Sequence, residues 1–164
     1  MSQADLRDPV SDEEYSVPKQ LILVVEDEPA IREMLAIALE AADYRVITAM
    51  DAQTGHARIV DDKPDLVLLD WMMPGTTGLE LLRRLKRDDL TAKVPVIMLT
   101  AKAEEDSKIS GLDAGADDFI PKPIDEDFVL QKVRYYASGM NLPAGANLSS
   151  VHSPSSENPA RGAI

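Results

Sequence analysis

Short apolar segments alternate with segments of helical periodicity, and this alternation limits the fold more than any other feature of the chain. The apolar segments are QLILVVED (20–27), YRVITA (44–49), DLVLLD (65–70), VPVIMLTA (94–101) and DDFI (117–120). The continuous run at 20–27 is typical of a strand that is covered on both faces. The chain is therefore expected to form five strands with a helix after each.

The intervals between the apolar runs carry the signals of helices. Pro29 suits a first helical position, and residues 51–61 predict a second, shorter helix. Residues 103–114 predict another, which Gly115 is expected to end. The helix after Pro29 has one apolar face, formed at helical spacing by Ile31, Met34, Leu35, Ala38 and Leu39.

Polar residues mark two more helix starts. Thr77 and Glu80 have the spacing of a capping box, and Asp125 is a candidate N-cap. The helix after Asp125 is expected to bury Val129, Leu130, Val133 and Ala137.

Five strands that alternate with five helices imply right-handed crossovers and a three-layer, doubly wound α/β fold with a parallel five-stranded sheet. The chain length favours the strand order 2-1-3-4-5.

Composition excludes several classes of function. The chain has 164 residues, of which 17 are basic and 29 acidic, giving a net charge of −12. This balance argues against direct binding of nucleic acid, which needs Lys and Arg to neutralise phosphates. Cysteine is absent, which excludes disulfides and suits the cytoplasm. Because no signal peptide or long apolar span is visible, we expect a cytoplasmic protein without a membrane segment.

The composition changes at both ends of the alternating region. Residues 1–19 are acidic and have no apolar period, which predicts a flexible arm. Residues 139–164 are rich in Ser, Pro, Asn and Gly, which predicts a flexible polar tail. One domain is therefore expected over residues 20–138.

Three carboxylates are expected to meet where the strand order reverses. The first strand ends in Glu26 and Asp27, the third ends in Asp70, and the predicted order makes these strands neighbours. Ligands of such sheets bind at this switch point, beyond the carboxyl ends of the strands. Oxygen ligands without Cys or His favour Mg²⁺. Read alone, the acidic residues before Pro29 fit helix-start electrostatics equally well, and Asp70 alone fits a turn.

Two more strand ends carry complementary groups. Thr100 closes the fourth strand, and Lys122 follows the fifth in the sequence Pro-Lys-Pro. Singly, the threonine suits a helix N-cap and the lysine an exposed loop. A hydroxyl and a fixed cation beside a carboxylate nucleophile and Mg²⁺ are, however, the groups that phosphoryl transfer requires.

The segments ILVVEDEP, PDLVLLDWMMPGTTG, VPVIMLTA and GADDFIPKP resemble, in order and spacing, the receiver domains of two-component response regulators. They are most similar to receivers that precede winged-helix DNA-binding domains. The resemblance covers residues 20–138 and implies a (βα)5 receiver fold. It also implies that Asp70 accepts a phosphoryl group from a histidine kinase or a histidine phosphotransfer protein.

The same resemblance implies roles for the other residues. Asp27, Asp70 and the main-chain carbonyl of Met72 would bind Mg²⁺, or alternatively Mn²⁺, and Glu26 would contact the ion through water. Thr100 and Lys122 would hold the phosphoryl oxygens. Phe119 would be the switch aromatic that turns inward when Thr100 moves, and a cis peptide bond is implied between Lys122 and Pro123.

Some residues depart from the family pattern. Pro121 stands where a small or polar residue is usual, and it removes an N–H donor beside Lys122. Phe128 stands where related DNA-binding regulators often have an acidic residue of the dimer surface. No winged-helix sequence follows Met140.

Part of an ion-pair face is nevertheless present in Lys108, Asp118 and Lys132. We expect a monomer, or a dimer formed on phosphorylation through the fourth helix, fifth strand and fifth helix. The expected function is a phosphorylation-dependent switch that signals to a downstream protein. Alternatives are a phosphorelay carrier and the receiver part of a DNA-binding regulator that lacks its effector domain.

An aspartyl phosphatase is a rival from another class. Such enzymes also place an aspartate after an apolar strand, but they typically carry a second aspartate two residues later. That position is Met72 here. We therefore expect no enzyme beyond Mg²⁺-dependent self-phosphorylation and slow self-dephosphorylation at Asp70.

Overall fold

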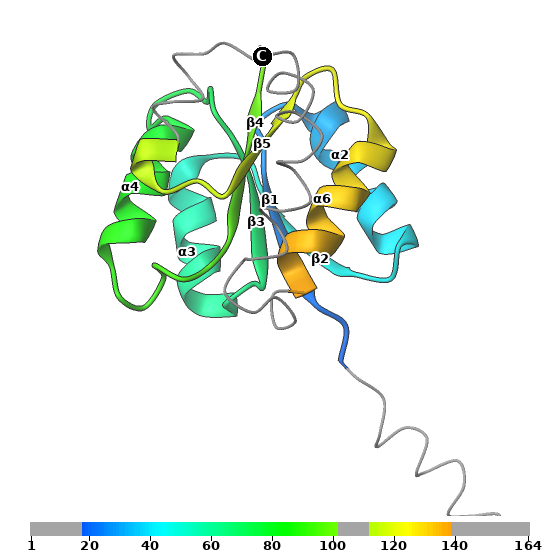
Figure 1. Ribbon diagram of the computed structural model, residues 1–164. Helices are drawn as coiled ribbons and strands as arrows, with labels where there is room; N and C mark the ends of the chain where they lie inside the picture. Colours follow the sequence, from blue (N-terminus) through cyan, green and yellow to red (C-terminus); the bar gives the residue numbers. More distant parts are fainter. Residues whose placement is uncertain (1–17, 102–111, 139–164) are drawn as a thin grey trace, which may run out of the picture.

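The computed structural model of the chain describes residues 18–101 and 112–138. Its sheet has five parallel strands in the order β2-β1-β3-β4-β5, as predicted. The carboxyl ends of the strands lie at the top of Figure 1. The strands are β1 (Leu21–Val25), β2 (Arg45–Ala49), β3 (Leu66–Asp70), β4 (Val96–Thr100) and β5 (Asp118–Pro121).

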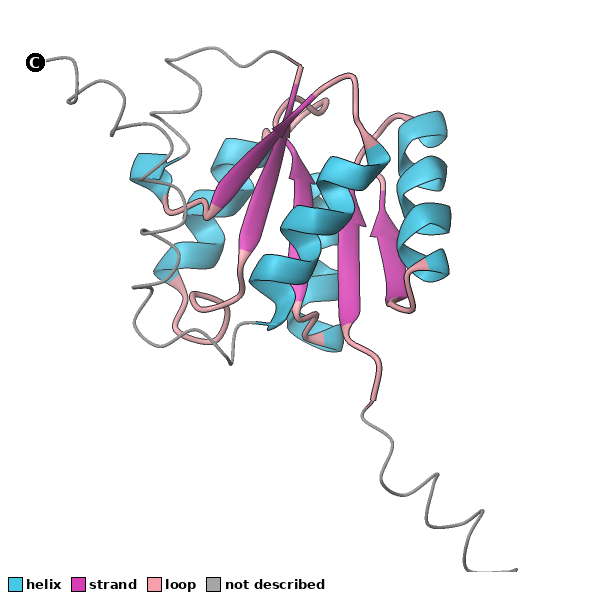
Figure 2. Ribbon diagram, turned by 45° about the vertical axis from the view of Figure 1, so that its right-hand side comes forward, coloured by secondary structure: helices cyan, strands magenta, loops and turns pink. Residues whose placement is uncertain are grey.

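Helices cover both faces of the sheet, which confirms the three-layer α/β fold (Figure 2). Helices α3 and α4 pack on one face and α2 and α6 on the other (Figure 1). None of the described helices is long and apolar enough to cross a membrane. The helices are α2 (Pro29–Ala41), α3 (Ala52–Asp62), α4 (Gly78–Arg87) and α6 (Glu126–Ser138).

The predicted helix over residues 103–114 lies mostly outside the described residues, as do the predicted arm and tail. Residues 112–114 are helical. The Gly115 N–H donates to the carbonyl oxygen of Leu112 at 3.0 Å, and Gly115 has a φ of +108°. This left-handed conformation suits glycine at a helix end, so the predicted stop at Gly115 is confirmed.

The polar helix starts are confirmed by their hydrogen bonds. The Thr77 hydroxyl accepts from the Glu80 N–H at 3.2 Å, and the Glu80 carboxylate accepts from the Thr77 N–H at 3.0 Å. The Asp125 carboxylate accepts from the N–H groups of Asp127 and Phe128. In α3 the capping residue is Asp51 itself, so this helix begins one residue later than predicted.

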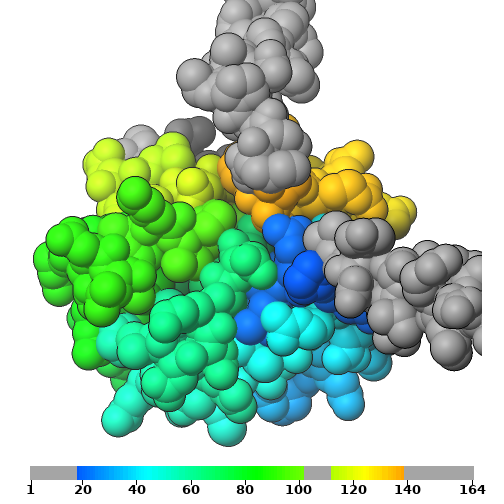
Figure 3. Space-filling model, turned by 90° about the horizontal axis from the view of Figure 1, so that it is seen from below, coloured from blue at the N-terminus to red at the C-terminus, as the bar shows by residue number. Residues whose placement is uncertain are grey.

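Figure 3 shows the molecule from the end opposite the carboxyl ends of the strands. At this end, hydrogen bonds join three segments of the chain. The Leu21 N–H donates to the Asp65 carboxylate at 2.7 Å, which ties the start of β1 to the start of β3. The Gln20 side-chain amide donates to the Ala137 carbonyl at the end of α6. These bonds hold the start of β1 in place against β3 and α6.

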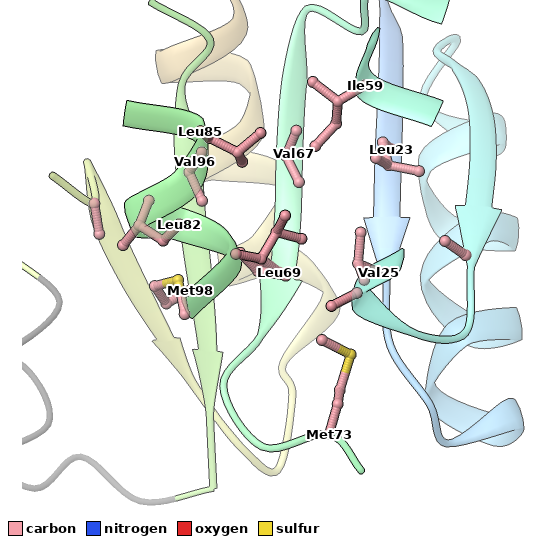
Figure 4. Packing of buried hydrophobic residues seen from close by; sticks show 14 residues of the cluster. Leu23, Val25, Ile59, Val67, Leu69, Met73, Leu82, Leu85, Val96 and Met98 are labelled. Atoms are coloured by element: carbon pink, nitrogen blue, oxygen red, sulfur yellow. The ribbon is translucent and has the colours of Figure 1, made fainter. Parts of the chain in front are cut away.

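Two hydrophobic clusters form the core, one on each face of the sheet. Strands β1, β3 and β4 are buried along their whole length, which explains their continuous apolar sequences. Figure 4 shows the cluster on the side of α3 and α4. Met73 belongs to it and points toward Val25. Met73 follows the strand in a turn, and this turn folds its side chain back into the core.

The outer edge of β5 lacks a free N–H group at two successive outward-facing residues, Phe119 and Pro121. The Lys122 N–H donates inward to Thr100 of β4, so by strand alternation the main-chain nitrogens of Phe119 and Pro121 face outward. The Phe119 N–H donates to the Asp118 carboxylate at 2.7 Å, and proline has no N–H.

A prediction follows from the contact between α4 and β3. A Cβ atom at Gly78 would lie 2.0 Å from the carbonyl oxygen of Asp70. Gly78→Ala should therefore separate the helix from the strand and lower the free energy of unfolding by about 2–3 kcal/mol. Urea denaturation followed by circular dichroism measures this loss.

Gly75→Ala is the matched control. Gly75 has a φ of +80°, and nothing lies within 4 Å of a Cβ built there. Replacement of Gly75 by alanine should lower the free energy of unfolding by about 1 kcal/mol, from backbone strain alone. If the Gly78 variant is no less stable than the Gly75 variant, the close contact does not constrain the fold.

Candidate functional site

The carboxylates of Glu26, Asp27 and Asp70 meet at the switch point between β1 and β3. Val25, the last residue of β1, pairs with Leu69 of β3, so Glu26, which follows β1, lies beside Asp70, the last residue of β3. One oxygen from each carboxylate lies within 4.8 Å of the others. Glu26 and Asp70 are buried, whereas Asp27 is half-buried. The expected clustering is thus confirmed.

Lys122 is the cation of this cluster. Its Nζ lies 3.1 Å from Asp70 Oδ1 and 3.0 Å from Glu26 Oε1. The Lys122 N–H donates to the Thr100 carbonyl at 2.6 Å, which continues the pairing between β4 and β5 past Pro121. Pro121 is tolerated because its nitrogen faces the open edge of the sheet. The lysine is therefore firmly coupled to β5, and the implied cis bond between Lys122 and Pro123 is present.

Burial of like charges controls the electrostatics of the site. Burial, and then the charge of Glu26, raise the pKa of Asp70 to about 7, although Lys122 acts in the opposite direction. Burial alone would lower the pKa of Lys122, but hydrogen bonds and the two negative charges outweigh it and raise that pKa. Three carboxylates and one ammonium leave an excess of negative charge that a divalent cation would neutralise.

The donor set of the cluster fits a hard divalent cation. It consists of carboxylate oxygens, without Cys or His, and two of the three carboxylates are buried. Mg²⁺ prefers such oxygen ligands and needs one or two carboxylates in addition to water. The residues present would therefore hold Mg²⁺, and the individual ligand roles stay predictions.

The turn after Asp70 forms the rim of the site. Trp71 is half-buried against the core, and the Met72 side chain is 63% exposed. Main-chain bonds from the Trp71 N–H to the Leu99 carbonyl and from the Gly78 N–H to the Trp71 carbonyl hold both ends of the turn. The predicted role of the Met72 carbonyl stays a prediction.

Thr100 and Phe119 lie on neighbouring strands. Thr100 is the last residue of β4 and is buried. Phe119 pairs with Met98 of β4 and packs against the core on the side of α3 and α4. Both residues line a groove of about 430 Å³ that also reaches Leu112 and Phe128. This arrangement connects the site to the face of β5 and α6, while the switching roles stay predictions.

The face of β5 and α6 carries an ion pair within the chain. Lys132 Nζ lies 2.6 Å from the Asp118 carboxylate, and its ammonium lies 5.1 Å from the centre of the Phe128 ring. The Tyr136 hydroxyl donates to the same carboxylate at 2.9 Å. The sequence pointed to Asp118 and Lys132, but the bond from Tyr136 to Asp118 was not predicted, because the place of this tyrosine on the helix gives no polar signal. Lys108 lies outside the described residues.

Sequence reasoning also missed Arg32. Its guanidinium donates from Nη1 to the carbonyl oxygens of Glu26 at 2.9 Å and Asp27 at 3.3 Å. A cation in the opening turn of a helix, where the dipole disfavours it, is the sequence signal that could have found it.

Comparison with known proteins decides the family. The family model of the response regulator receiver domain matches residues 22–134. The chain belongs to this family. Receivers of this family act in two-component systems and signal through phosphorylation, and they are generally not classical enzymes.

Curated relatives of the chain are longer proteins. The chain is 65% identical over 102 residues to the phosphate regulon transcriptional regulatory protein PhoB of Pseudomonas aeruginosa, covering 62% of this chain and 44% of that protein. It is 45% identical over 113 residues to the DNA-binding dual master transcriptional regulator RpaA of Synechocystis. This match covers 69% of this chain and 47% of that protein. The chain thus spans about half the length of these relatives.

Solved structures show the same fold. The chemotaxis protein CheY4 of Vibrio cholerae superposes with a TM-score of 0.70 at 27% identity, over 73% of this chain and 99% of that chain. The receiver domain of a sensor histidine kinase from Pseudomonas aeruginosa superposes with a TM-score of 0.68 at 26% identity, over 74% and 99%. The latter structure has a magnesium ion coordinated in its active-site cleft.

A prediction follows from the burial of Asp70. In the presence of a chelator, Asp70→Asn should raise the free energy of unfolding at pH 8 by roughly 2–4 kcal/mol, since the amide avoids both the desolvation and the repulsion that raise the pKa of this carboxyl. The folded protein keeps the Asp70 proton up to about pH 7, whereas the unfolded chain releases it near 3.8. The gain should therefore be absent below pH 4, grow as the pH rises to about 7, and then stay constant.

Urea denaturation over this pH range provides the measurement. Asp43→Asn is the control, because this exposed residue has a φ of +78°, which asparagine also adopts. The control loses only an exposed ion pair with Lys19, which contributes little to stability, so it should stay close to the wild type at every pH. A less stable Asp70 variant at pH 8 would contradict the electrostatic account.

Proposed function

We propose that the chain accepts a phosphoryl group on Asp70 from the phosphohistidine of a histidine kinase or a histidine phosphotransfer protein, and then signals to a downstream protein. One observation carries this proposal: a buried carboxylate at the end of β3 lies 3.1 Å from a lysine ammonium and beside two further carboxylates. Such an arrangement supplies a nucleophile and a fixed cation at one point of the sheet.

The chemistry is an in-line transfer. A carboxylate oxygen of Asp70 attacks the phosphorus atom, the bond from phosphorus to the imidazole nitrogen breaks, and its electron pair stays on that nitrogen. Lys122, now in contact with Asp70 and Glu26, stabilises the phosphoryl oxygens of the new acyl phosphate. Bound Mg²⁺ or Mn²⁺, held by Asp27, Asp70 and the Met72 carbonyl with Glu26 acting through water, would neutralise negative charge on the transferred group.

The signal then passes along the neighbouring strands. The Thr100 hydroxyl would donate to the new phosphoryl group, and Phe119 would move inward as Thr100 shifts. The groove shared by these two residues opens onto the face of β5 and α6. A change of population between two arrangements of this face is the proposed output. The protein would act as a monomer or as a phosphorylation-induced dimer through this face.

A second candidate is favoured by the relatives. PhoB and RpaA are transcriptional regulators by name, and this chain covers about half of each. The chain would then be the receiver part of such a regulator, and with a net charge of −12 it would leave contact with DNA to other sequence. A phosphorelay carrier is the remaining alternative, and each of these functions places the chain in the cytoplasm.

The decisive experiment compares the wild type with Asp70→Asn after incubation with Mg²⁺ and acetyl phosphate. Intact-mass measurement should show one phosphoryl adduct on the wild type and none on the variant. The adduct should be labile in base, as an acyl phosphate is, and slow loss of the adduct would report self-dephosphorylation.

Asp43→Asn serves again as the control and should be modified like the wild type. If the wild type gains no adduct, or if the Asp70 variant gains it equally, the proposed function is wrong. If the wild type does gain the adduct, transfer from a phosphorylated histidine kinase, measured in the same way, would identify the donor.

A further inference from the structure

Arg32 holds the main chain of the acidic segment between β1 and α2. Its Nη1 atom donates to the carbonyl oxygens of Glu26 and Asp27, at 2.9 and 3.3 Å. One nitrogen therefore restrains two successive peptide units. The Glu26 N–H is also fixed, since it donates to the Ala49 carbonyl of β2 at 3.0 Å.

The position of Arg32 is unfavourable for the helix itself. The amino-terminal end of a helix carries a partial positive charge, which disfavours a cation there. Helix α2 also begins without a side-chain cap, because Glu28 makes no capping hydrogen bond. A residue that breaks a local rule beside a functional cluster indicates a role in that cluster. The contacts of Arg32 show that it serves the acidic segment.

Asp27 depends on this restraint more than its neighbours do. Glu26 Oε2 accepts from the Glu28 N–H at 3.1 Å, and Lys122 holds both Glu26 and Asp70. Within the described part of the chain, the Asp27 carboxylate meets no lysine, arginine or N–H donor, and its polar neighbour is the carboxyl of Asp70. Apart from this contact with Asp70, the position of the Asp27 carboxylate therefore depends on how its main chain is held.

We propose that Arg32 is a positioning residue that aims the Asp27 carboxylate at Asp70 and thereby raises the affinity of the cluster for Mg²⁺. This inference rests on the metal site of the proposed function. Removal of a group that does not bind the metal but orients one of its ligands typically lowers metal affinity by about 10–100-fold. Mg²⁺ is especially sensitive because it demands near-ideal octahedral geometry, whereas Ca²⁺ accepts flexible coordination.

The direction of the change in Mg²⁺ affinity when Arg32 is replaced distinguishes a positioning role from a simple charge effect. Replacement of Arg32 by glutamine removes a positive charge near a cation site, so electrostatics alone predicts tighter binding of Mg²⁺. Loss of the two hydrogen bonds lets the segment move and predicts weaker binding. A charge effect would also change Mg²⁺ and Ca²⁺ affinity alike, whereas a geometric effect should weaken Mg²⁺ binding more.

The experiment titrates chelator-treated protein with MgCl₂ and, separately, with CaCl₂. Trp71, the single tryptophan, adjoins Asp70, so its fluorescence provides a signal that does not depend on phosphorylation. Arg32→Gln should raise the Mg²⁺ dissociation constant about tenfold and the Ca²⁺ constant less. Arg32→Lys should recover part of the loss, because an ammonium also donates to carbonyl oxygens.

Arg58→Gln is the matched control. Arg58 lies on α3, is exposed and pairs with Asp62, so its replacement removes the same charge away from the acidic segment. Its Mg²⁺ constant should stay within about twofold of the wild type, because solvent and salt screen an exposed charge. Circular dichroism melts in chelator establish that each variant is folded.

Three results would overturn the proposal. They are unchanged or tighter Mg²⁺ binding by Arg32→Gln, equal losses for Mg²⁺ and Ca²⁺, and no recovery in Arg32→Lys. Failure of the wild type to bind Mg²⁺, by fluorescence and by thermal stabilisation, would instead remove the metal site on which the inference rests. Normal wild-type binding with an unaffected glutamine variant would remove only the role of Arg32.

Discussion

The burial of several carboxylates at one end of a parallel sheet is the constraint on which the rest of the structure depends. Burial of charge is costly unless partners compensate for it, and here one lysine, just after the edge strand β5, contacts two of the three acidic groups. The core on both faces keeps β1, β3 and β4 fixed, so these groups cannot move apart to relieve their repulsion. The fold thus maintains a site that attracts cations.

Most of the fold could be predicted from the chain because its local signals agree with one another. The continuous apolar runs of β1, β3 and β4 correspond to strands that are buried along their length, and the Thr77–Glu80 pair and Gly115 mark helix ends, as the structure has them. The burial of Met73 could not be predicted, because nothing in the local sequence tells whether a turn folds a side chain back into the core. Such a contact depends on the tertiary path of the chain.

The clustering of the candidate site was equally predictable, because strand order alone brings the ends of β1 and β3 together. The supporting contacts were less so. The contact of Tyr136 with Asp118 leaves no residue pattern of its own, and the contact of Arg32 with main-chain carbonyls leaves only an unusual cation in the first turn of a helix. Pro121, which the sequence presents as a break beside Lys122, is accommodated because β5 is an edge strand.

The outward side of β5 has a consequence for how other proteins meet this molecule. An exposed edge strand ordinarily invites another chain to extend the sheet. Here one outward N–H is already bonded to the Asp118 carboxylate, and the next outward position is a proline. Extension of the sheet along this edge is therefore disfavoured, because two outward positions in succession lack an N–H group that could donate to another strand. The face beside this edge presents side chains such as Phe128 and Lys132 in place of main-chain donors.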